Sequence, residues 1–219
     1  GLMPIGRSLV KTGITPDVIT VIGIVMSGVA AVTIGAGYLR VGFLFLLLTA
    51  IPDALDGAVA RAAGTGSKRG AYFDSVSDRL TDGMLFGGVA WYLASTEPGR
   101  IMMLPVAIMG LAMFISYQRA KAESLGWDAK GGIMERAERI VVLAFALLFP
   151  ELLIATLWVM LVLTAITAVQ RFVKVWKQAT AEHDRPAPAR RARRRPRTRT
   201  SVEPLWRQRM RERREARNG

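Results

Sequence analysis

Residues 43–61 read FLFLLLTAIPDALDGAVAR, a run of large apolar side chains that ends in two carboxylates, Asp53 and Asp56, and one cation, Arg61. The apolar run is typical of a membrane helix. A charged side chain near the centre of such a helix costs roughly 2.5–3.5 kcal/mol on insertion scales, so these acids need partners within the fold. Ionisable residues in membrane segments commonly mark a binding or catalytic site. This stretch therefore predicts a membrane helix that carries a functional site at one end.

The whole chain is apolar for its size. It has 219 residues, of which 51% are hydrophobic, and its mean hydropathy is +0.28. A helix needs about 20 apolar residues to cross the hydrocarbon core of a bilayer. Six stretches meet or approach this length, at 17–37, 41–62, 71–94, 101–120, 137–150 with its flanks, and 152–173. We therefore predict an all-α integral membrane protein with six transmembrane helices.

The chain divides into three predicted regions. Residues 1–14 form a short amphipathic helix beside the membrane and lack the features of a signal peptide. Residues 15–177 form the six-helix membrane domain, which would also be the catalytic domain. Residues 178–219 form a basic tail that is poor in apolar side chains, so we predict disorder with at most a marginal helix after Pro204. We expect this tail to attach to anionic membrane lipids rather than to nucleic acid.

The distribution of Lys and Arg predicts the orientation. Cytoplasmic loops collect positive charge. With six crossings, every Lys and Arg except Arg40, Arg79 and Arg100 falls on one side. Both termini and the acidic site are then on the cytoplasmic side of the cell membrane. A five-span arrangement would place the tail, with its 14 arginines at 185–219, outside the cell, against this count.

The residue types limit the chemistry open to this protein. The chain has no cysteine, and His183 is its one histidine. Disulfides, thiolate nucleophiles, Cys-ligated zinc and histidine-based metal sites or triads are therefore excluded. Any metal ion must be held by oxygen ligands.

A second group of acids, which includes Asp74 and Asp78, lies on the next predicted helix. Their i,i+4 spacing places them on one helical face. The short GTGSKRG loop makes the two helices an antiparallel hairpin, in which Asp53 lies level with Asp78, and Asp56 with Asp74. Four carboxylates this close would repel one another unless divalent cations joined them. Two such ions are the usual clamp for phosphoryl chemistry.

Other residues of the hairpin have either a functional or a structural interpretation. Gly57 allows a ligand to approach closely, and Arg61 suits bidentate binding of a phosphate. Alternatively, the acids form ion pairs with Arg61, Arg79 and loop lysines that only fix helix packing. Asp82 lies deepest in the predicted membrane helix, and we expect it to pair with Arg79 at i,i+3 in a structural role.

The hairpin resembles the signature of a known family. Its pattern is Asp53-x2-Asp56-Gly57-x2-Ala60-Arg61-x8-Gly70-x3-Asp74-x3-Asp78. This is similar at every fixed position to the signature of the CDP-alcohol phosphotransferase family. The resemblance runs from Thr15-Pro16 through six helices to about residue 177, although many members have Asn where this chain has Asp17. It implies transfer of a substituted phosphate from CDP-diacylglycerol to an alcohol, with release of CMP.

The resemblance also implies roles for single residues. Asp53, Asp56, Asp74 and Asp78 would bind two Mg²⁺ ions, with Mn²⁺ as the alternative, and Asp78 would also be the general base. The expected contacts to the CDP-lipid are Pro16, Asp17, Thr20, Gly57, Arg61 and Ser67. Members of this family often form dimers through their membrane helices, and we expect a homodimer here.

The acceptor alcohol is not part of this signature. The last three predicted helices carry cations at their cytoplasmic ends, which favours a phosphorylated acceptor over free inositol or serine, although the ordinary cytoplasmic excess of positive charge also accounts for them. The stretches SYQRAKAESLG and GIMERAERIV resemble actinobacterial phosphatidylinositol phosphate synthases, which use inositol 1-phosphate. On that resemblance, the contacts to the acceptor phosphate are Ser116, Arg119, Arg136, Arg139 and Arg171. Glycerol 3-phosphate is the alternative acceptor.

Two other classes of membrane protein also use buried acids. Intramembrane prenyltransferases hold a diphosphate lipid through aspartates and magnesium, but their aspartate motifs lie in separate halves of a larger bundle. A cation transporter would carry acids near the bilayer midplane, and this chain has no visible inverted repeat. Release of CMP separates these classes from the predicted enzyme.

Overall fold

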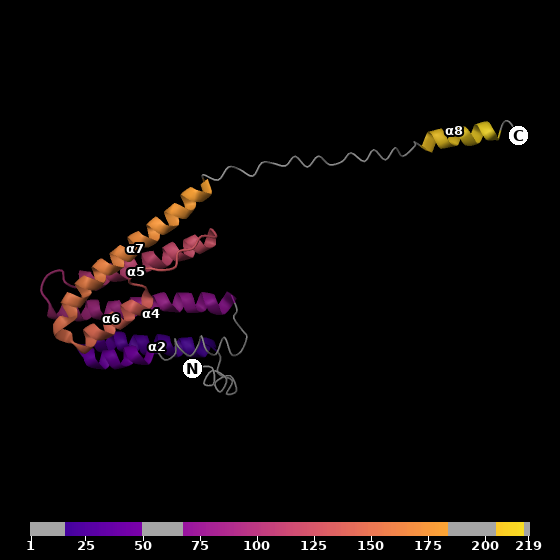
Figure 1. Cartoon of the computed structure of the whole chain (residues 1–219). Coiled ribbons are helices and arrows are strands. Elements are labelled where there is room, and N and C mark those ends of the chain that lie inside the picture. The colour runs from indigo at the N-terminus through magenta and orange to yellow at the C-terminus, as the bar shows by residue number, and fades with distance from the viewer. Residues whose placement is uncertain (1–15, 50–67, 184–204, 217–219) are drawn as a thin grey trace, which may run out of the picture. The chain divides into compact units, whose positions relative to one another are not determined.

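The computed structural model describes residues 16–49, 68–183 and 205–216, which contain helices and no strand. The elements, in chain order, are α2 (Pro16–Gly35), a helix at Leu39–Thr49, α4 (Lys68–Thr96), α5 (Met103–Ser124), α6 (Arg136–Leu148), the 3₁₀ helix η1 (Pro150–Leu152), α7 (Leu153–His183) and α8 (Leu205–Glu215). The chain forms two compact units, Gly1–Glu182 and His183–Gly219. Figure 1 shows the helices of the first unit running back and forth through the bundle.

Local sequence signals explain where several helices begin and end. Pro16 opens α2 and Asp17 lies in its first turn. The fixed φ of proline suits that position, and a carboxylate is favourable at a helix N-terminus. Gly37, with φ +90°, turns the chain after α2, and Gly126, with φ +82°, does so after α5. Glycine adopts this left-handed conformation without the penalty of a Cβ atom.

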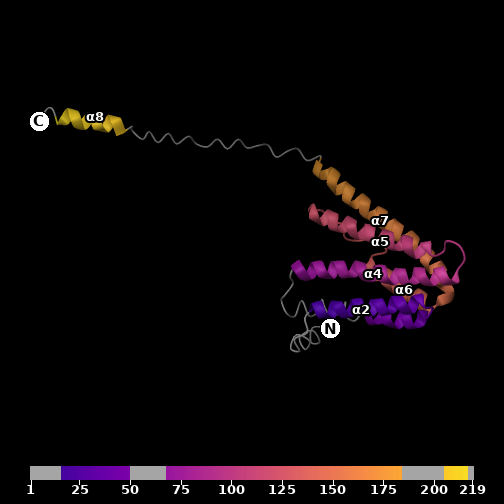
Figure 2. The same ribbon diagram turned by 180° about the vertical axis from the view of Figure 1, so that it is seen from behind.

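The core of the first unit is built on α4. This helix packs against α2 on one side and α5 on the other, and the same order is seen from behind (Figure 2). At Gly88 the backbones of α4 and α2 are so close that a Cβ would lie 2.5 Å from the carbonyl oxygen of Ala31. Fully buried side chains from several helices fill the centre, among them Ile34, Phe86 and Leu157.

Several helices have the length and composition of membrane spans. Three described helices are long and apolar enough to cross a bilayer, at Asp17–Gly35, Met103–Ser124 and Pro150–Glu182, and a shorter apolar helix lies at Leu39–Thr49. α4 is 29 residues long, but its first half carries several charged side chains, among them Asp74, Asp78 and Asp82. The molecule is therefore an all-helical membrane protein with polar groups concentrated at one end of α4.

The structure differs from the sequence prediction at the C-terminal end of the membrane domain. α7 continues to His183, beyond the predicted end of the span at 173 and past the start of the predicted tail at 178. Polar contacts to the loop before α6 hold this extension. Within the tail, the helix that the sequence allowed after Pro204 is present as α8, Leu205–Glu215. This segment lacks Gly and Pro and contains five Arg and two Glu, which are strong helix formers. Residues 184–204 of the predicted disordered tail lie outside the described residues.

Candidate active site

The two described acids of the signature, Asp74 and Asp78, lie one turn apart on the first half of α4. Asp74 is exposed and Asp78 is half-buried. Both line two neighbouring cavities. Their predicted partners on the preceding helix lie outside the described residues, as do three predicted contacts to the CDP-lipid. These residues are Asp53, Asp56, Gly57, Arg61 and Ser67.

The first cavity, which we call the arginine cavity, has a volume of about 430 Å³ between α4, α5, α6 and α7. All five predicted contacts to the acceptor phosphate line it, although they come from three different helices. Together with the two acids these residues are Ser116, Arg119, Arg136, Arg139, Arg171, Asp74 and Asp78. The fold thus brings side chains up to 97 positions apart in the chain (Asp74 to Arg171) around one space.

The second cavity, of about 500 Å³, lies on the other side of the same acids. Its described lining combines hydroxyl and apolar side chains from α2, the Leu39–Thr49 helix, α4 and α6, among them Thr20, Ser27 and Ile140. Asp74, Asp78, Arg136 and Ala137 line both cavities. The acids therefore lie where a polar, arginine-rich space meets a more apolar one.

Arg136 joins the acids of α4 to the start of α6. Its Nη1 lies 3.0 Å from Asp78 Oδ1, and its Nε lies 3.4 Å from Asp82 Oδ1. Its Nη2 donates a hydrogen bond of 3.1 Å to Thr81 Oγ1. A guanidinium has five N–H donors in a planar fork, so one arginine can hold several acceptors in a defined geometry.

Asp82 is an anchor for the buried arginine of α6. Arg139 Nη2 lies 2.9 Å from Asp82 Oδ2, and the two side chains are 3% and 6% exposed. The expected pairing of Asp82 with Arg79 is therefore wrong. Arg79 turns back along α4, where it contacts Asp78 Oδ2 at 3.4 Å and the carbonyl oxygen of Ser75 at 2.7 Å. Asp82 pairs with Arg139 of α6 rather than with Arg79 of its own helix, because Arg139 is buried and needs a carboxylate partner.

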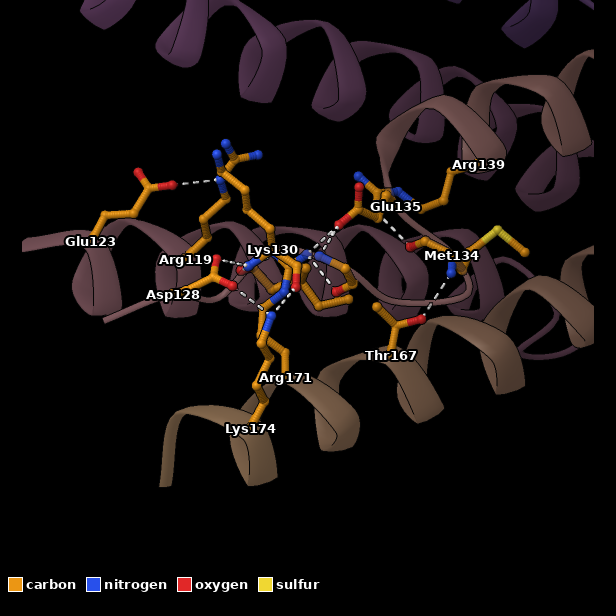
Figure 3. Close-up of polar contacts among 12 residues, drawn as sticks. Arg119, Glu123, Asp128, Lys130, Met134, Glu135, Arg139, Thr167, Arg171 and Lys174 are labelled. Carbon is orange, nitrogen blue, oxygen red and sulfur yellow. Dashed lines mark hydrogen bonds and ion pairs between the residues drawn. The ribbon is translucent and has the colours of Figure 1, made fainter. Parts of the chain in front are cut away.

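Arg171 of α7 is held by the two segments that flank the cavity. Nη2 lies 2.8 Å from Glu135 Oε1 and 3.1 Å from the carbonyl oxygen of Gly131, while Nη1 donates to the carbonyl oxygen of Ile115 at 3.2 Å. Figure 3 shows this arrangement from α7 up to the loop before α6. The guanidinium is thus fixed in place by α5, α7 and the loop together.

The cavity has no strong excess of positive charge. Its described lining includes five arginines and six acidic residues. However, the Nε groups of Arg139 and Arg171 are buried and, in the part of the chain that the structure describes, have no hydrogen-bond partner. An unsatisfied buried donor costs about 1–3 kcal/mol. Both arginines line the cavity, but these two nitrogens are closed off from it, so they do not offer hydrogen bonds to a ligand there.

The other predicted contacts lie at the edges of the site. Arg119 pairs with Glu123 at 2.9 Å, within α5, and both side chains are partly exposed (Figure 3). Asp17 forms an exposed pair of 3.0 Å with Arg69 at the start of α4. Thr20 lines the second cavity, one turn further along α2. Pro16, the first residue of α2, lies beside Asp17 in the chain.

The donor set fits a hard divalent cation as far as it is described. Asp74 and Asp78 present carboxylate oxygens to the same two cavities, and oxygen ligands are what Mg²⁺ and Mn²⁺ prefer. Within the described ranges no group of three or more His, Cys, Asp or Glu side chains is arranged to hold a metal ion. The other two predicted ligands fall in residues 50–67, outside those ranges.

Some residues of the site were missing from the sequence prediction, or, like Asp82, were given another partner there. Glu135 pairs with Arg171, and Thr81 and Asp82 bind Arg136. The continued i,i+4 spacing from Asp78 to Asp82 was a signal that Asp82 belongs to the same face. Its partner could not be read from the sequence, because that choice depends on which helix packs against this face.

Apolar helices around paired carboxylates and buried arginines are the features of a membrane enzyme that handles phosphorylated substrates. A family model described as CDP-alcohol phosphatidyltransferase matches residues 13–170. The chain belongs to this family. It is therefore a membrane-embedded transferase of phospholipid biosynthesis.

Similar proteins are phosphatidylinositol phosphate synthases of actinobacteria. The Mycobacterium marinum protein is 37% identical over 183 residues, covering 79% of this chain and 78% of the relative. The Corynebacterium glutamicum protein is 32% identical over 194 residues, covering 85% and 89%. Among solved structures, Mycobacterium tuberculosis phosphatidylinositol phosphate synthase with CDP-DAG bound has a TM-score of 0.75 and 34% identity, covering 80% of this chain and 92% of that one. The same enzyme in complex with manganese and citrate also has a TM-score of 0.75.

Proposed function

We propose that this protein transfers the phosphatidyl group of CDP-diacylglycerol to inositol 1-phosphate, giving phosphatidylinositol phosphate and CMP. The observation that carries this proposal is the position of Asp74, Asp78 and Arg136 between an arginine cavity and a more apolar one. Two substrates of different character, a soluble polyol phosphate and a lipid, can then meet at the same acids. The names of the similar proteins support the same pair of substrates.

In this mechanism the acceptor enters the arginine cavity. Its hydroxyl oxygen attacks the phosphorus that carries the diacylglycerol, the bond from that phosphorus to the CMP oxygen breaks, and CMP leaves with the bonding electrons. Asp78 accepts the hydroxyl proton as general base. A carboxylate is a sufficient base here because the phosphoanhydride already has a good leaving group. Arg136 contacts Asp78 and Asp82. It is therefore suited to hold the acceptor phosphate at a fixed position relative to Asp78.

The acceptor phosphate would bind Ser116, Arg119, Arg136, Arg139 and Arg171. The position of all five around the arginine cavity supports this assignment, since charge-assisted hydrogen bonds to phosphate are about twice as strong as neutral ones. The predicted alternative, glycerol 3-phosphate, carries the same phosphate group. Inositol 1-phosphate is favoured by the names of the similar proteins.

Divalent cations, Mg²⁺ or Mn²⁺, would be held by Asp53, Asp56, Asp74 and Asp78. When bound, two such ions neutralise a diphosphate and stabilise the charge on the departing nucleotide. Pro16, Asp17, Thr20, Gly57, Arg61 and Ser67 would bind the CDP-lipid. Thr20 supports this assignment, because it shares the second cavity with Asp74 and Asp78.

The proposed topology has six membrane helices, with both termini and the active site on the cytoplasmic side of the cell membrane, in a homodimer. The distribution of Lys and Arg supports the orientation. The region boundaries proposed from the sequence stay at 1–14, 15–177 and 178–219, apart from the longer α7. The basic tail would bind anionic lipids of the same membrane.

A test of the function uses the purified full-length protein in detergent with CDP-diacylglycerol and Mg²⁺. Inositol 1-phosphate, glycerol 3-phosphate, inositol and serine are added in turn, and CMP and product lipid are measured. We expect CMP release with inositol 1-phosphate and loss of release when Mg²⁺ is replaced by a chelator. Release with none of the four acceptors would refute the enzyme proposal, and preference for glycerol 3-phosphate would select the alternative.

The tail provides a separate prediction. Removal of residues 186–219 should leave turnover within about twofold in detergent, because these residues lie beyond α7 and beyond the family match. The tail itself should bind vesicles that contain anionic lipid, with about 1 kcal/mol of binding free energy for each basic residue that reaches the surface. The measurements are CMP release and vesicle co-sedimentation of a soluble tail peptide, with neutral vesicles as control. A folded truncation that has lost turnover would contradict this prediction.

A further inference from the structure

The loop between α5 and α6, residues 125–135, lies along α7 and is fastened to it by a row of polar side chains. These side chains are spaced by three or four positions, so they share one face of α7. They are Thr167, Arg171, Lys174, Gln178 and Glu182. We call this row the α7 clamp.

The first half of the clamp lies next to the arginine cavity and is seen in Figure 3. Thr167 Oγ1 accepts a hydrogen bond of 2.9 Å from the backbone N–H of Met134. Lys174 Nζ lies 2.8 Å from Asp128 Oδ2 and 2.7 Å from the carbonyl oxygen of Lys130. The Lys174 ammonium is therefore directed to the loop, and Lys174 is not among the described residues that line the cavity.

The second half of the clamp lies further along α7. The amide of Gln178 pairs with both backbone groups of Asp128: Nε2 donates to the carbonyl oxygen at 2.6 Å, and Oε1 accepts from the N–H at 2.9 Å. Trp127 Nε1 donates a 2.6 Å hydrogen bond to Glu182 Oε2. These contacts explain why α7 extends past the predicted end of the membrane span.

Two glycines let the loop come this close to α7. Gly131 has φ +97° and Gly132 has φ +150°, a region that side chains rarely adopt. A Cβ atom added at Gly132 would collide with the methyl group of Thr167. The close contact of the loop with α7 thus depends on the sequence of both elements.

The clamped loop supplies the backbone atoms that orient the two buried arginines of the cavity. The carbonyl oxygen of Gly131 accepts from Arg171 Nη2 at 3.1 Å, and that of Met134 accepts from Arg139 Nη1 at 3.3 Å. Glu135 completes the connection, because its Oε1 accepts from Arg171 and from the N–H of Gly131. A shift of the loop would therefore move both guanidinium groups.

We propose that Lys174 and Gln178 are positioning residues for the acceptor site. They hold residues 125–135 so that the carbonyl groups of Gly131 and Met134 direct Arg171 and Arg139 into the cavity, and they do not touch the substrate. This inference rests on the proposed function, since it assigns the cavity to the acceptor. The ordinary alternative, that Lys174 is itself a phosphate contact, is less favoured, because two of the three N–H donors of its ammonium already bind the loop.

The ion pair between Lys174 and Asp128 positions the loop rather than stabilising the fold. The side chains of Lys174 and Asp128 are 43% and 58% exposed, and exposed pairs contribute little to the free energy of unfolding. The hydrogen bond from Lys174, with a further one from the Lys130 N–H, lowers the pKa of Asp128. A lowered pKa keeps the carboxylate ionised to a more acidic pH than usual, so the pair is intact at neutral pH.

The test compares Lys174→Met, Asp128→Asn, their double variant and Gln178→Ala in the full-length enzyme. Each should raise KM for inositol 1-phosphate about tenfold, within the roughly 100-fold loss that a 1 Å misplacement can cause. KM for CDP-diacylglycerol and the melting temperature should stay near the wild-type values. The double variant should be no worse than Lys174→Met, because Lys174→Met already removes the contact to Asp128. Lys177→Met, which removes a lysine of α7 outside the clamp, is the matched control.

Two results would overturn the proposal. A much larger effect of Lys174→Met than of Asp128→Asn, with additive loss in the double variant, would make Lys174 a direct phosphate contact. An unchanged KM in all four variants would show that the loop needs no clamp. Hydrogen exchange of residues 125–135 provides a readout without activity, and we expect faster exchange in Lys174→Met but not in Lys177→Met. A wild-type protein that releases no CMP with any acceptor but keeps this exchange pattern would refute the function and retain the clamp.

Discussion

Replacement of Asp78 by Asn is expected to lower the rate of CMP release by about 10²–10⁴-fold, the usual contribution of a general base. The amide has nearly the shape of the carboxylate but cannot accept the acceptor proton. It is also a weaker ligand for a divalent cation. Arg136 Nη1, 3.0 Å from Asp78 Oδ1, can still bond to the amide oxygen, so the protein should fold. The measurement is CMP release at saturating CDP-diacylglycerol and inositol 1-phosphate.

The matched control for Asp78→Asn is Glu97→Gln, the same change of carboxylate to amide at an exposed residue just beyond the other end of α4. It should leave turnover unchanged. Binding of a CDP-lipid to Asp78→Asn, followed by a fluorescent or radioactive nucleotide, should be weakened much less than turnover. Normal turnover in Asp78→Asn would mean that another group takes the proton.

Asp82→Ala should lower the free energy of unfolding by about 3–5 kcal/mol, the usual cost of leaving one partner of a buried ion pair without the other. Asp82 and Arg139 are almost fully buried and lie 2.9 Å apart. Without the carboxylate, Arg139 keeps one hydrogen bond, to the carbonyl oxygen of Met134, which does not offset a buried charge. Thermal unfolding of the detergent-solubilised protein measures the loss.

Two further variants separate charge from packing in this prediction. Asp17→Asn breaks an exposed pair with Arg69 and should cost less than about 1 kcal/mol. The double variant Asp82→Leu with Arg139→Met removes both charges and should regain much of the stability, but it should bind inositol 1-phosphate poorly because one of the arginines that line the cavity is gone. If Asp82→Ala unfolds like the wild type, the pair does not hold α4 and α6 together.

Local signals in the sequence were sufficient for much of the helical framework. Pro16 and Asp17 at the start of α2, and Gly126 after α5, mark helix ends by their backbone preferences, which need no tertiary contact. The end of α7 could not be predicted in this way. The span was expected to end at 173 because hydropathy falls there, whereas Lys174 and Gln178 continue the helix through contacts to a loop 46 to 50 positions away in sequence.

The sequence by itself determined the class of the protein and the type of its chemistry. The apolar runs require a membrane, the absence of cysteine leaves oxygen ligands for metals, and the i,i+4 spacing places Asp74 and Asp78 on one face. Only the tertiary structure decided which charged side chains form ion pairs with one another. Arg136 turned out to contact Asp78 and Asp82, Arg139 to pair with Asp82 instead of Arg79, and Arg171 to depend on Glu135. Spacing along a helix reports only which residues share a face, whereas the partner of a buried charge depends on the neighbouring helix and on its rotation and depth.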